Sequence, residues 1–321
     1  MSRINVGVLR GGPSSEYDVS LKTGATVLQH MPDKYHAKDI FISKDGVWHV
    51  HGMPKSPEKA LRHIDVVFNA MHGEYGEDGT VQKILDTHRV PYTGSGTLAS
   101  AIGMNKLLAK KVFTSHGIKS PYHYVANKDQ SLNDMYRYLF EHFHLPAVVK
   151  PAIGGSSIGV TLVNKYTDLI VALELAFSYS PTVLVEEYIR GREATCGVLD
   201  DFRDQKYYAL LPVEIIPPAT HGFFNYDAKY SGVSQEICPG NFNEEEKLAI
   251  QEAAVAAHKA LGLRHYSRSD FIVTPKRGVY ILEVNTLPGL TPESLFPKSI
   301  EAVGFHFPHF LDHLIQLALQ K

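Results

Sequence analysis

Two carboxylates, an amide and an arginine lie close together in a stretch that begins at Arg268 and reads RSDFIVTPKRGVYILEVNTLPGLTPESL. Two strand-like runs flank the turn signal TPKRG, which predicts a β-hairpin. A tight turn at residues 276–277 would set Asp270 opposite Glu283, and the same register sets Arg268 opposite Asn285. Such oxygen ligands suit Mg²⁺. Proteins commonly coordinate this ion through one or two carboxylates, and substrate phosphates occupy other coordination positions. The alternative is an edge hairpin whose polar face lies in water.

Alternation along the second strand predicts which side chains share a face. The even-numbered residues 280–284 would lie on one face, and Ile281, Glu283 and Asn285 on the other. A loop rich in glycine and proline, residues 286–295, follows directly. Because loops on rigid strands often carry functional residues, we expect this loop to complete the site.

Composition and charge describe a globular protein. The chain has 321 residues, 44% of them hydrophobic and 21% charged, which is enough for two or three domains. The net charge of −2 provides no electrostatic argument for a nucleic-acid or membrane partner. The chain begins without a signal-peptide pattern and contains no run of 18 apolar residues, so we expect a cytoplasmic protein. Cys196 and Cys238 are too few for a disulfide framework.

The first third of the chain repeats a strand, a glycine-containing loop and a helix. Strand patterns occupy residues 4–10, 36–43 and 65–71, with helical patterns after the first and third. This order predicts a parallel sheet whose loops gather at the carboxyl ends of the strands, where α/β proteins bind ligands. Glu16 stands where the first helix begins. It either compensates the helix dipole or binds a cationic group.

A glycine- and serine-rich loop follows Lys150 at the end of a strand. Small residues and free backbone amides suit a flap over phosphate oxygens. The letters GSSIG also match the nucleophile elbow of serine hydrolases, with Ser157 as the nucleophile. An elbow leads from a strand into a helix, whereas residues 160–164 have the pattern of a strand. The sequence therefore favours a hairpin flap.

Further along, a strand over residues 182–189 precedes a long irregular segment. Glu186 and Glu193 are candidates for binding ribose hydroxyls, although either could be an exposed strand glutamate. Residues 216–240 are rich in glycine, proline and aromatic residues, which is typical of a lid over a site. An amphipathic helix is expected over residues 244–261, and the tail from residue 301 onward has a helical pattern.

Six motifs together resemble the D-alanine:D-alanine ligases of the ATP-grasp superfamily. In order they are GGPSSEYDVS, HGEYGEDGT, VPYTGSG with the NK that follows it, VVKPAIGGSSIGV, YDAKY, and RSDF with LEVNTLPGLTPESL, spread over residues 11–295. The resemblance implies an ATP-grasp fold, α/β with an α+β C-terminal half. Its domains would be an N-terminal α/β domain (1–104), a central domain with the flap (105–187) and a C-terminal catalytic domain with the lid (188–321).

The resemblance also implies an activity. The protein would use ATP to join two D-alanines through an acylphosphate, as a step of peptidoglycan precursor synthesis. It would be a cytoplasmic homodimer without a nucleic-acid or membrane partner. Tyr230 matches a position where ligases of this type that select an amine carry tyrosine and those that select D-lactate carry phenylalanine. The resemblance therefore implies a dipeptide product.

The resemblance assigns roles to individual residues. The ATP phosphates would be contacted by Lys106, Lys150, the flap at Ser157 and, at the γ-phosphate, Lys229. The adenine would lie along Glu186, Glu187 and Ile189, and the ribose would be bound by Glu193. Two Mg²⁺ ions, or Mn²⁺ in their place, would be held by Asp270, Glu283 and Asn285.

The same resemblance assigns the amino-acid site. The first D-alanine would contact His72 and Glu16, and Glu16 would be linked through Ser156 to Tyr230. The oxyanion would be stabilised by Arg268 and the Gly289 amide, and the second D-alanine would be held by Ser294 and Leu295. Three alternatives stay open: an ATP-grasp ligase with D-lactate or D-serine as acceptor, a non-catalytic nucleotide-binding protein, and a serine hydrolase acting through Ser157.

Overall fold

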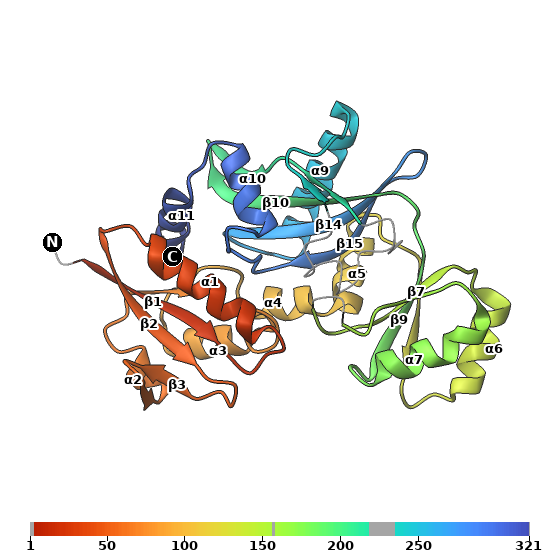
Figure 1. Cartoon of the computed structure of the whole chain (residues 1–321), viewed down its shortest axis with the longest axis horizontal. Coiled ribbons are helices and arrows are strands. Elements are labelled where there is room, and N and C mark those ends of the chain that lie inside the picture. The colour runs from red at the N-terminus through yellow and green to blue at the C-terminus, as the bar shows by residue number, and fades with distance from the viewer. Residues whose placement is uncertain (1–2, 156–157, 218–234, 321) are drawn as a thin grey trace.

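Three separate sheets form the framework of the protein. The computed structural model describes residues 3–155, 158–217 and 235–320. Figure 1 shows the sheets along the long axis, with the first at the N-terminal end, the third in the middle and the second at the far end. In the described part of the chain, no helix is both long and apolar enough to cross a membrane.

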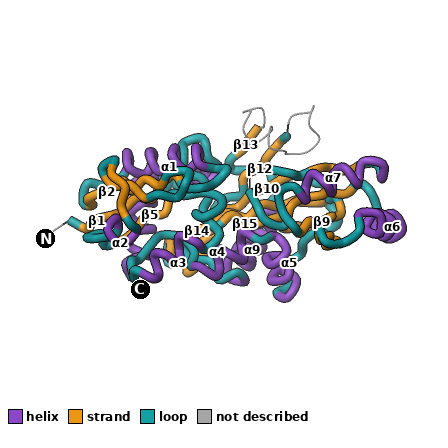
Figure 2. The backbone as a smooth tube through the Cα atoms, turned by 90° about the horizontal axis from the view of Figure 1, so that it is seen from below, coloured by secondary structure: helices purple, strands orange, loops and turns teal. Residues whose placement is uncertain are grey.

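The first sheet has the strand order β4-β3-β2-β1-β5, and strand β1 pairs in parallel with both of its neighbours. Its strands are β1 (Ile4–Gly11), β2 (Tyr35–Ile42), β3 (Trp48–Val50), β4 (Met53–Lys55) and β5 (Val66–Asn69). The associated helices are α1 (Tyr17–His30), α2 (Pro57–Ala60), α3 (Thr80–Thr87) and α4 (Thr97–Met104). Figure 2 shows α1 on one side of this sheet and α2 and α3 on the other, which agrees with the two apolar clusters that flank it.

The second sheet is antiparallel and has the order β6-β9-β7-β8. Its elements are β6 (His123–Asn127), α6 (Leu132–His142), β7 (Ala147–Pro151), β8 (Thr161–Val163), η1 (Tyr166–Asp168), α7 (Leu169–Phe177) and β9 (Thr182–Glu187). The pairing of β7 with β8 confirms the predicted hairpin around the flap. The serine hydrolase alternative is not favoured, because the described segment after Ser157 leads into the strand β8 where an elbow requires a helix.

The third sheet has the order β13-β12-β10-β14-β15, and β11 also pairs with β10. Its strands are β10 (Arg192–Phe202), β11 (Gln205–Ala209), β12 (Val213–Ile216), β13 (Gln235–Ile237), β14 (Tyr266–Thr274) and β15 (Gly278–Asn285). The predicted amphipathic helix is α9 (Glu244–Ala260), which begins with a capping box between Asn243 and Glu246. It packs on this sheet together with α5 (Lys106–Ser115) through one apolar cluster. The predicted lid falls mostly on residues 218–234, which lie outside the described residues.

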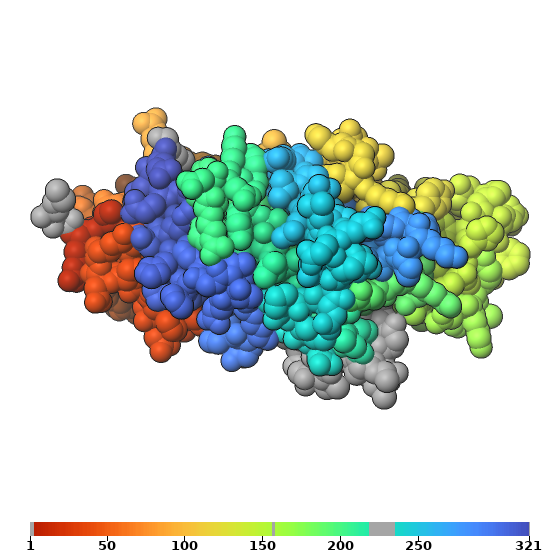
Figure 3. All heavy atoms as spheres, turned by 90° about the horizontal axis from the view of Figure 1, so that it is seen from above, coloured from red at the N-terminus to blue at the C-terminus, as the bar shows by residue number. Residues whose placement is uncertain are grey.

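The helical tail joins the first and third sheets. It consists of α10 (Leu295–Ala302) and α11 (Phe307–Leu319). One apolar cluster contains Val6 and Phe68 of the first sheet, Tyr266 of the third sheet and Leu311 of α11. In Figure 3 the dark blue C-terminal residues lie directly against the red N-terminal ones. Residues at the two ends of the chain therefore share one core.

Candidate active site

The hairpin of β14 and β15 sets the register that the sequence predicts. Asp270 pairs with Glu283, and Arg268 pairs with Asn285. The turn is longer than expected, because Thr274 pairs with Gly278 and leaves residues 275–277 in the loop. A β-bulge between Asp270 and Phe271 shifts the register by one residue and so restores the predicted pairs.

The bulge changes which side chains share a face, so the prediction of strict alternation is wrong. Ile281 and Val284 both belong to the apolar cluster beneath α9, with Phe271 of β14. Tyr280 and Leu282 pack instead on the opposite side of the hairpin, with Ile189 and Ile272. The physical reason is that Leu282 is an extra residue between the pairs to Phe271 and Asp270, so the two-residue period breaks there.

Asp270 has two partners on its own face of the sheet. Its carboxylate accepts from Arg268 through Nε at 3.0 Å and Nη2 at 3.1 Å. Its Oδ1 also accepts from Thr195 Oγ1 of β10 at 2.7 Å, and Thr195 is its direct cross-strand partner. Burial would lower the pKa of Arg268, but the charges of Asp270 and Glu283 outweigh it and raise that pKa. Arg268 is therefore a fixed cation at the site.

Glu283 and Asn285 face the start of the flap and the loop after β15. Lys106 Nζ lies 3.4 Å from Glu283 Oε2 and donates to the Gly154 carbonyl at 2.5 Å. Asn285 Oδ1 accepts from the backbone amide of Leu287 at 3.1 Å. Lys106 thus joins the carboxylate hairpin to the flap.

The donor set at this hairpin fits a hard cation for which the protein supplies only some of the ligands. Within the described ranges no three His, Cys, Asp or Glu side chains gather as a metal centre. Asp270, Glu283 and Asn285 contribute two carboxylates and one amide oxygen from adjoining strands. Mg²⁺ characteristically takes one or two protein carboxylates and fills its remaining positions with water and substrate phosphates.

A buried carboxylate separates two buried lysines behind the flap. Glu186 of β9 is 2% exposed; its Oε2 lies 2.9 Å from Lys150 Nζ and its Oε1 lies 3.1 Å from Lys110 Nζ. Burial would raise the pKa of Glu186, but the two lysines outweigh it and lower that pKa. Glu186 is therefore not an exposed strand glutamate. The sequence did not lead us to single out Lys110. It stands one helical turn after Lys106 on α5, so the two lysines lie on the same side of the helix.

A small apolar cluster lies beside these charges. Ile189 is 5% exposed and packs with Ile272, Tyr280 and Leu282. Glu193 on β10 stands directly opposite Ile272 in the sheet, which places it on the same face. The neighbouring Glu187 is bound to the hairpin turn through Arg277 Nη2 at 3.0 Å. The apolar cluster and the carboxylates of the hairpin consequently share one face of the third sheet.

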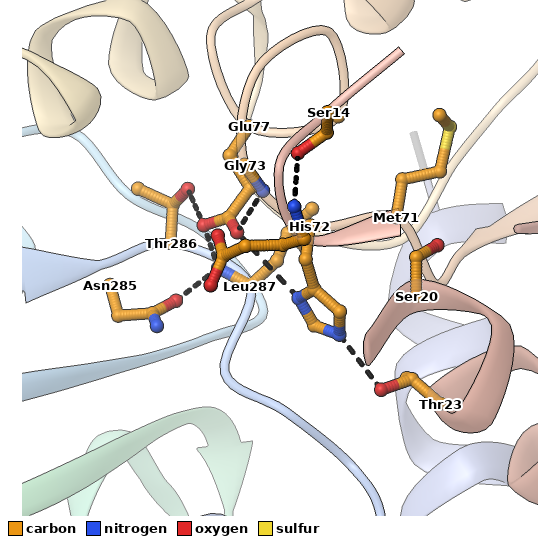
Figure 4. A network of polar contacts seen from close by, with 12 residues as sticks. Ser14, Ser20, Thr23, Met71, His72, Gly73, Glu77, Asn285, Thr286 and Leu287 are labelled. Carbon is orange, nitrogen blue, oxygen red and sulfur yellow. Dashed lines mark hydrogen bonds and ion pairs between the residues drawn. The ribbon is translucent and has the colours of Figure 1, made fainter. Parts of the chain in front are cut away.

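A second buried carboxylate, Glu77, links the first sheet's loops to the loop after β15 (Figure 4). It is 7% exposed and accepts from the Gly73 amide at 3.0 Å and from the Leu287 amide at 3.3 Å. The hydroxyl of Thr286 donates to it at 3.4 Å, and His72 Nδ1 lies 3.6 Å away. The sequence reasoning missed Glu77, although it stands five residues after His72 in the HGEYGEDGT motif.

His72 is buried between two partners. Its Nε2 lies 2.8 Å from Thr23 Oγ1 on α1, and its Nδ1 faces Glu77. Burial would lower the pKa of His72, but the hydrogen bond and charge of Glu77, followed by the charge of Glu16, outweigh it and raise that pKa. The imidazole is thereby fixed in place and biased towards its protonated form.

Glu16 lies between the first sheet's loops and the flap. It stands at the start of α1, but its side chain makes no capping hydrogen bond. A β-carbon on Gly73, or one on Gly155 of the flap, would come within 3.0 Å of Glu16 Oε2. The carboxylate is therefore close to both loops, which argues against a role confined to the helix dipole.

The loop after β15 returns to the site at the start of α10. Ser294 precedes α10 without a side-chain capping bond, and its Oγ lies 2.9 Å from Thr291 Oγ1. A β-carbon on Gly289 would approach Ser294 Oγ to 2.9 Å. Leu295 is the first residue of the helix. The loop therefore brings the Gly289 backbone close to Ser294.

The structure places most of the predicted site residues that it describes in one region, and their roles stay predictions. Ser156 and Ser157 of the flap and Lys229 and Tyr230 of the lid lie outside the described residues. The predicted link from Glu16 through Ser156 to Tyr230 therefore stays a prediction.

Two family models together match nearly the whole chain. The model described as D-ala D-ala ligase N-terminus matches residues 5–59 and 51–95, and the one described as D-ala D-ala ligase C-terminus matches residues 112–316. The D-alanine–D-alanine ligase of Pelotomaculum thermopropionicum is 40% identical over 99% of this chain and 98% of its own length. That of Geobacter sulfurreducens is 40% identical over 97% of this chain and 92% of its own.

Solved structures agree with these relatives. The D-alanine-D-alanine ligase from Coxiella burnetii matches with a TM-score of 0.85 and 28% identity, covering 99% of this chain and 94% of that one. The VanG D-Ala:D-Ser ligase from Enterococcus faecalis matches with a TM-score of 0.86 and 32% identity, covering 99% and 100%. These likenesses confirm the predicted ATP-grasp fold. Family models, whole-length identity and fold thus agree that the chain belongs to the D-alanine–D-alanine ligase family.

Proposed function

We propose that the protein joins two D-alanines to D-alanyl-D-alanine and converts ATP to ADP and phosphate. The observation that carries this proposal is that the candidate metal ligands and Arg268 gather on one face of the third sheet. Asp270, Glu283, Asn285 and Arg268 lie there beside an apolar cluster, and Lys106 Nζ lies 3.4 Å from Glu283 Oε2. Membership of the family supplies the substrate class.

The chemistry explains why such a site is needed. A carboxylate does not react with an amine at neutral pH, so the first D-alanine must be activated. Its carboxylate oxygen attacks the γ-phosphorus of ATP, ADP leaves, and an acylphosphate forms. The free amine of the second D-alanine then attacks the acyl carbon, the amine loses a proton, and phosphate leaves from the oxyanionic intermediate. Catalysis of both steps depends mainly on positioning and on charge stabilisation.

The nucleotide would lie between the second and third sheets. Lys106 and Lys150 would bind its phosphates, together with Ser157 of the flap and Lys229 of the lid. Its adenine would lie at Ile189, along Glu186 and Glu187, and Glu193 would bind the ribose. Asp270, Glu283 and Asn285 would hold two Mg²⁺ ions, or Mn²⁺, which neutralise phosphate charge during transfer.

The two amino acids would lie between the hairpin and the first sheet. Glu16 would bind the ammonium group of the first D-alanine beside His72. Arg268 and the Gly289 amide would donate to the oxyanion, a contribution of about 3 kcal/mol for each donor. Ser294 and Leu295 would bind the carboxylate of the second D-alanine. The flap and the lid, through Ser156 and Tyr230, would exclude water from the acylphosphate.

The test is phosphate release with Mg²⁺ and ATP across D-alanine, L-alanine, D-serine and D-lactate, with products identified by mass spectrometry. We expect release with D-alanine and a dipeptide product. A depsipeptide from D-lactate, or a mixed product with D-serine as the preferred acceptor, would contradict the proposed acceptor. Nucleotide binding without any D-alanine-dependent release would contradict the proposed activity.

Two broader proposals concern organisation. The domains 1–104, 105–187 and 188–321 are supported by the three sheets, each of which falls within one of these ranges. Limited proteolysis should cut near residues 105 and 188 before it cuts within them. We also propose a cytoplasmic homodimer that associates through the N-terminal domain. Sedimentation of the purified protein as a monomer at micromolar concentration would contradict the dimer.

A further inference from the structure

Lys110 is a buried lysine to which the reaction above gives no role. It is 1% exposed, and its Nζ lies 3.1 Å from Glu186 Oε1 and 3.3 Å from the carbonyl of Pro121. It comes from α5, whose apolar residues Ala109 and Phe113 face the core shared with α9 and β15. Lysines are almost never fully buried without a partner, so the position of this one needs a reason.

The buried cluster around Lys110 carries an excess of positive charge. Lys110 and Lys150 share the single carboxylate of Glu186, one lysine on each oxygen. Burial, followed by the charge of Lys110, lowers the pKa of the nearby His123, which is therefore neutral at pH 7. Glu187 is engaged by Arg277 at the surface. Two cations and one anion leave a net charge of +1 in a poorly solvated site.

Such an excess is costly unless an anion compensates it. Lys150 stands at the end of β7, directly before the flap, and the proposed function places a nucleotide phosphate there. If Glu186 had Lys150 as its only partner, the pair would be neutral and Lys150 would be held by the carboxylate. With Lys110 on the other oxygen, one positive charge remains for the phosphate.

We propose that Lys110 is a positioning residue of the nucleotide site, which holds one oxygen of Glu186 and so leaves the charge of Lys150 available to a nucleotide phosphate. The proposal rests on the proposed function, because it takes the ligand to be ATP. Lys110 itself does not touch the nucleotide. Its effect is on affinity and reaches the chemical step only through Lys150.

The proposal has a consequence for proton binding. Burial lowers the pKa of Lys110 to about 8, against the opposing effect of Glu186. A phosphate anion next to the cluster favours the protonated lysine and raises this pKa. At about pH 8 the free protein is partly deprotonated at Lys110, so nucleotide binding takes up protons. The affinity for nucleotide accordingly weakens as the pH rises through 8.

The experiment compares Lys110→Met with Lys111→Met, since Lys111 is the exposed next residue of the same helix. In phosphate-release assays with D-alanine, Lys110→Met is expected to raise the KM for ATP by about tenfold or more, with a much smaller change in kcat. Lys111→Met should match the wild type. Equal KM values for ATP in the wild type and a folded Lys110→Met variant would overturn the proposal.

A second measurement uses the wild-type protein and so does not depend on any variant folding. Calorimetric titration with Mg²⁺ and a non-hydrolysable ATP analogue at pH 8, in two buffers of different ionisation enthalpy, gives the protons taken up. We expect uptake by the wild type and by Lys111→Met, and none by Lys110→Met or Lys110→Arg, because arginine does not titrate there. Absence of uptake in the wild type would overturn the proposal.

These outcomes distinguish a failure of the proposed function from a failure of the role proposed for Lys110. A wild-type protein that binds no nucleotide analogue and releases no phosphate with D-alanine would refute the proposed function itself. A wild-type protein that is active, with a Lys110→Met variant of unchanged KM and unchanged proton uptake, would refute only the role of Lys110.

Discussion

At the scale of single residues, the proposed metal ligands are already tied to catalytic groups. Asp270 accepts from Arg268 and Thr195, and Glu283 lies beside Lys106. The carboxylates of the hairpin are therefore held by partners on β14, β10 and α5. Such support is what keeps a site within the small tolerance that catalysis allows.

The first prediction concerns these carboxylates. Asp270→Asn and Glu283→Gln each keep the shape of the side chain but remove its charge, so each should lower D-alanine-dependent phosphate release by at least about a hundredfold. The control is Glu245→Gln, an exposed position on α9 that should retain wild-type turnover. Undiminished turnover in both hairpin variants would show that the metal assignment is wrong.

The second prediction concerns His72 and Glu77. The folded pKa of His72 is raised, so its protonation stabilises the fold below its ordinary value of 6.5, and this stabilisation is lost as the pH rises through the folded pKa. Glu77→Gln removes the first of the raising causes and leaves burial, so the pKa of His72 should fall. An NMR titration of the histidine ring nitrogens measures it. An unchanged pKa would contradict the role given to Glu77.

At the scale of elements, the hairpin shows what the sequence can and cannot predict. The strand runs, the turn signal and the pairing of Asp270 with Glu283 were all readable from residue order. The bulge at Leu282 was not, because an extra residue leaves the alternating pattern intact on either side of it. The loop over residues 275–277 and the bulge compensate each other, which is why a wrong turn still produced the right pairs.

The third prediction tests the bulge with adjacent aliphatic residues. Ile281 is fully buried under α9, so Ile281→Ala should lower the free energy of unfolding by about 2–5 kcal/mol and leave the KM for ATP nearly unchanged. Leu282 is partly buried and packs on the apolar cluster where the adenine is proposed to lie, so Leu282→Ala should cost less stability and raise the KM for ATP several-fold. Strict alternation would place Ile281 next to Glu283 and predict the reverse assignment.

Buried partners from distant segments were the other omission. Glu77 accepts hydrogen bonds from residues 286–287, and Lys110 forms an ion pair with Glu186. In both cases the partners are far apart in the chain. Local patterns mark each of these residues only as polar. Which polar groups face one another depends on how the sheets pack, and a single sequence does not contain that information. The lysine pair on α5 and the motif around His72 were the available signals.

At the scale of the whole molecule, segments that are far apart in the chain pack into one core. Val6 and Phe68 of the first sheet pack with Leu311 and Phe310 of α11, and the same cluster contains Tyr266 of the third sheet. The composition and the α/β pattern predicted the first sheet. They did not predict that its apolar face would be covered by the last helix, because both segments are apolar on one side and each could have had other partners.

The fourth prediction follows from this shared core. Phe310 is fully buried and its ring packs against Tyr266 and Phe296. Phe310→Ala should lower the free energy of unfolding in urea by about 3–5 kcal/mol. Fluorescence and circular dichroism should report the same lowered midpoint, since the first and third sheets lose the same contact. Leu248→Ala, at a side chain 56% exposed on α9, should change stability little.

The position of α11 also bears on how the protein is made. Synthesis on the ribosome delivers the first sheet early and α11 after the other helices that the structure describes, and domains generally begin to fold in the order of synthesis. Until α11 emerges, the strands that carry Val6 and Phe68 lack part of the cover that the finished protein provides. Part of this apolar surface is therefore expected to stay uncovered until α11 has been synthesised, and a chain truncated before α11 would keep it exposed.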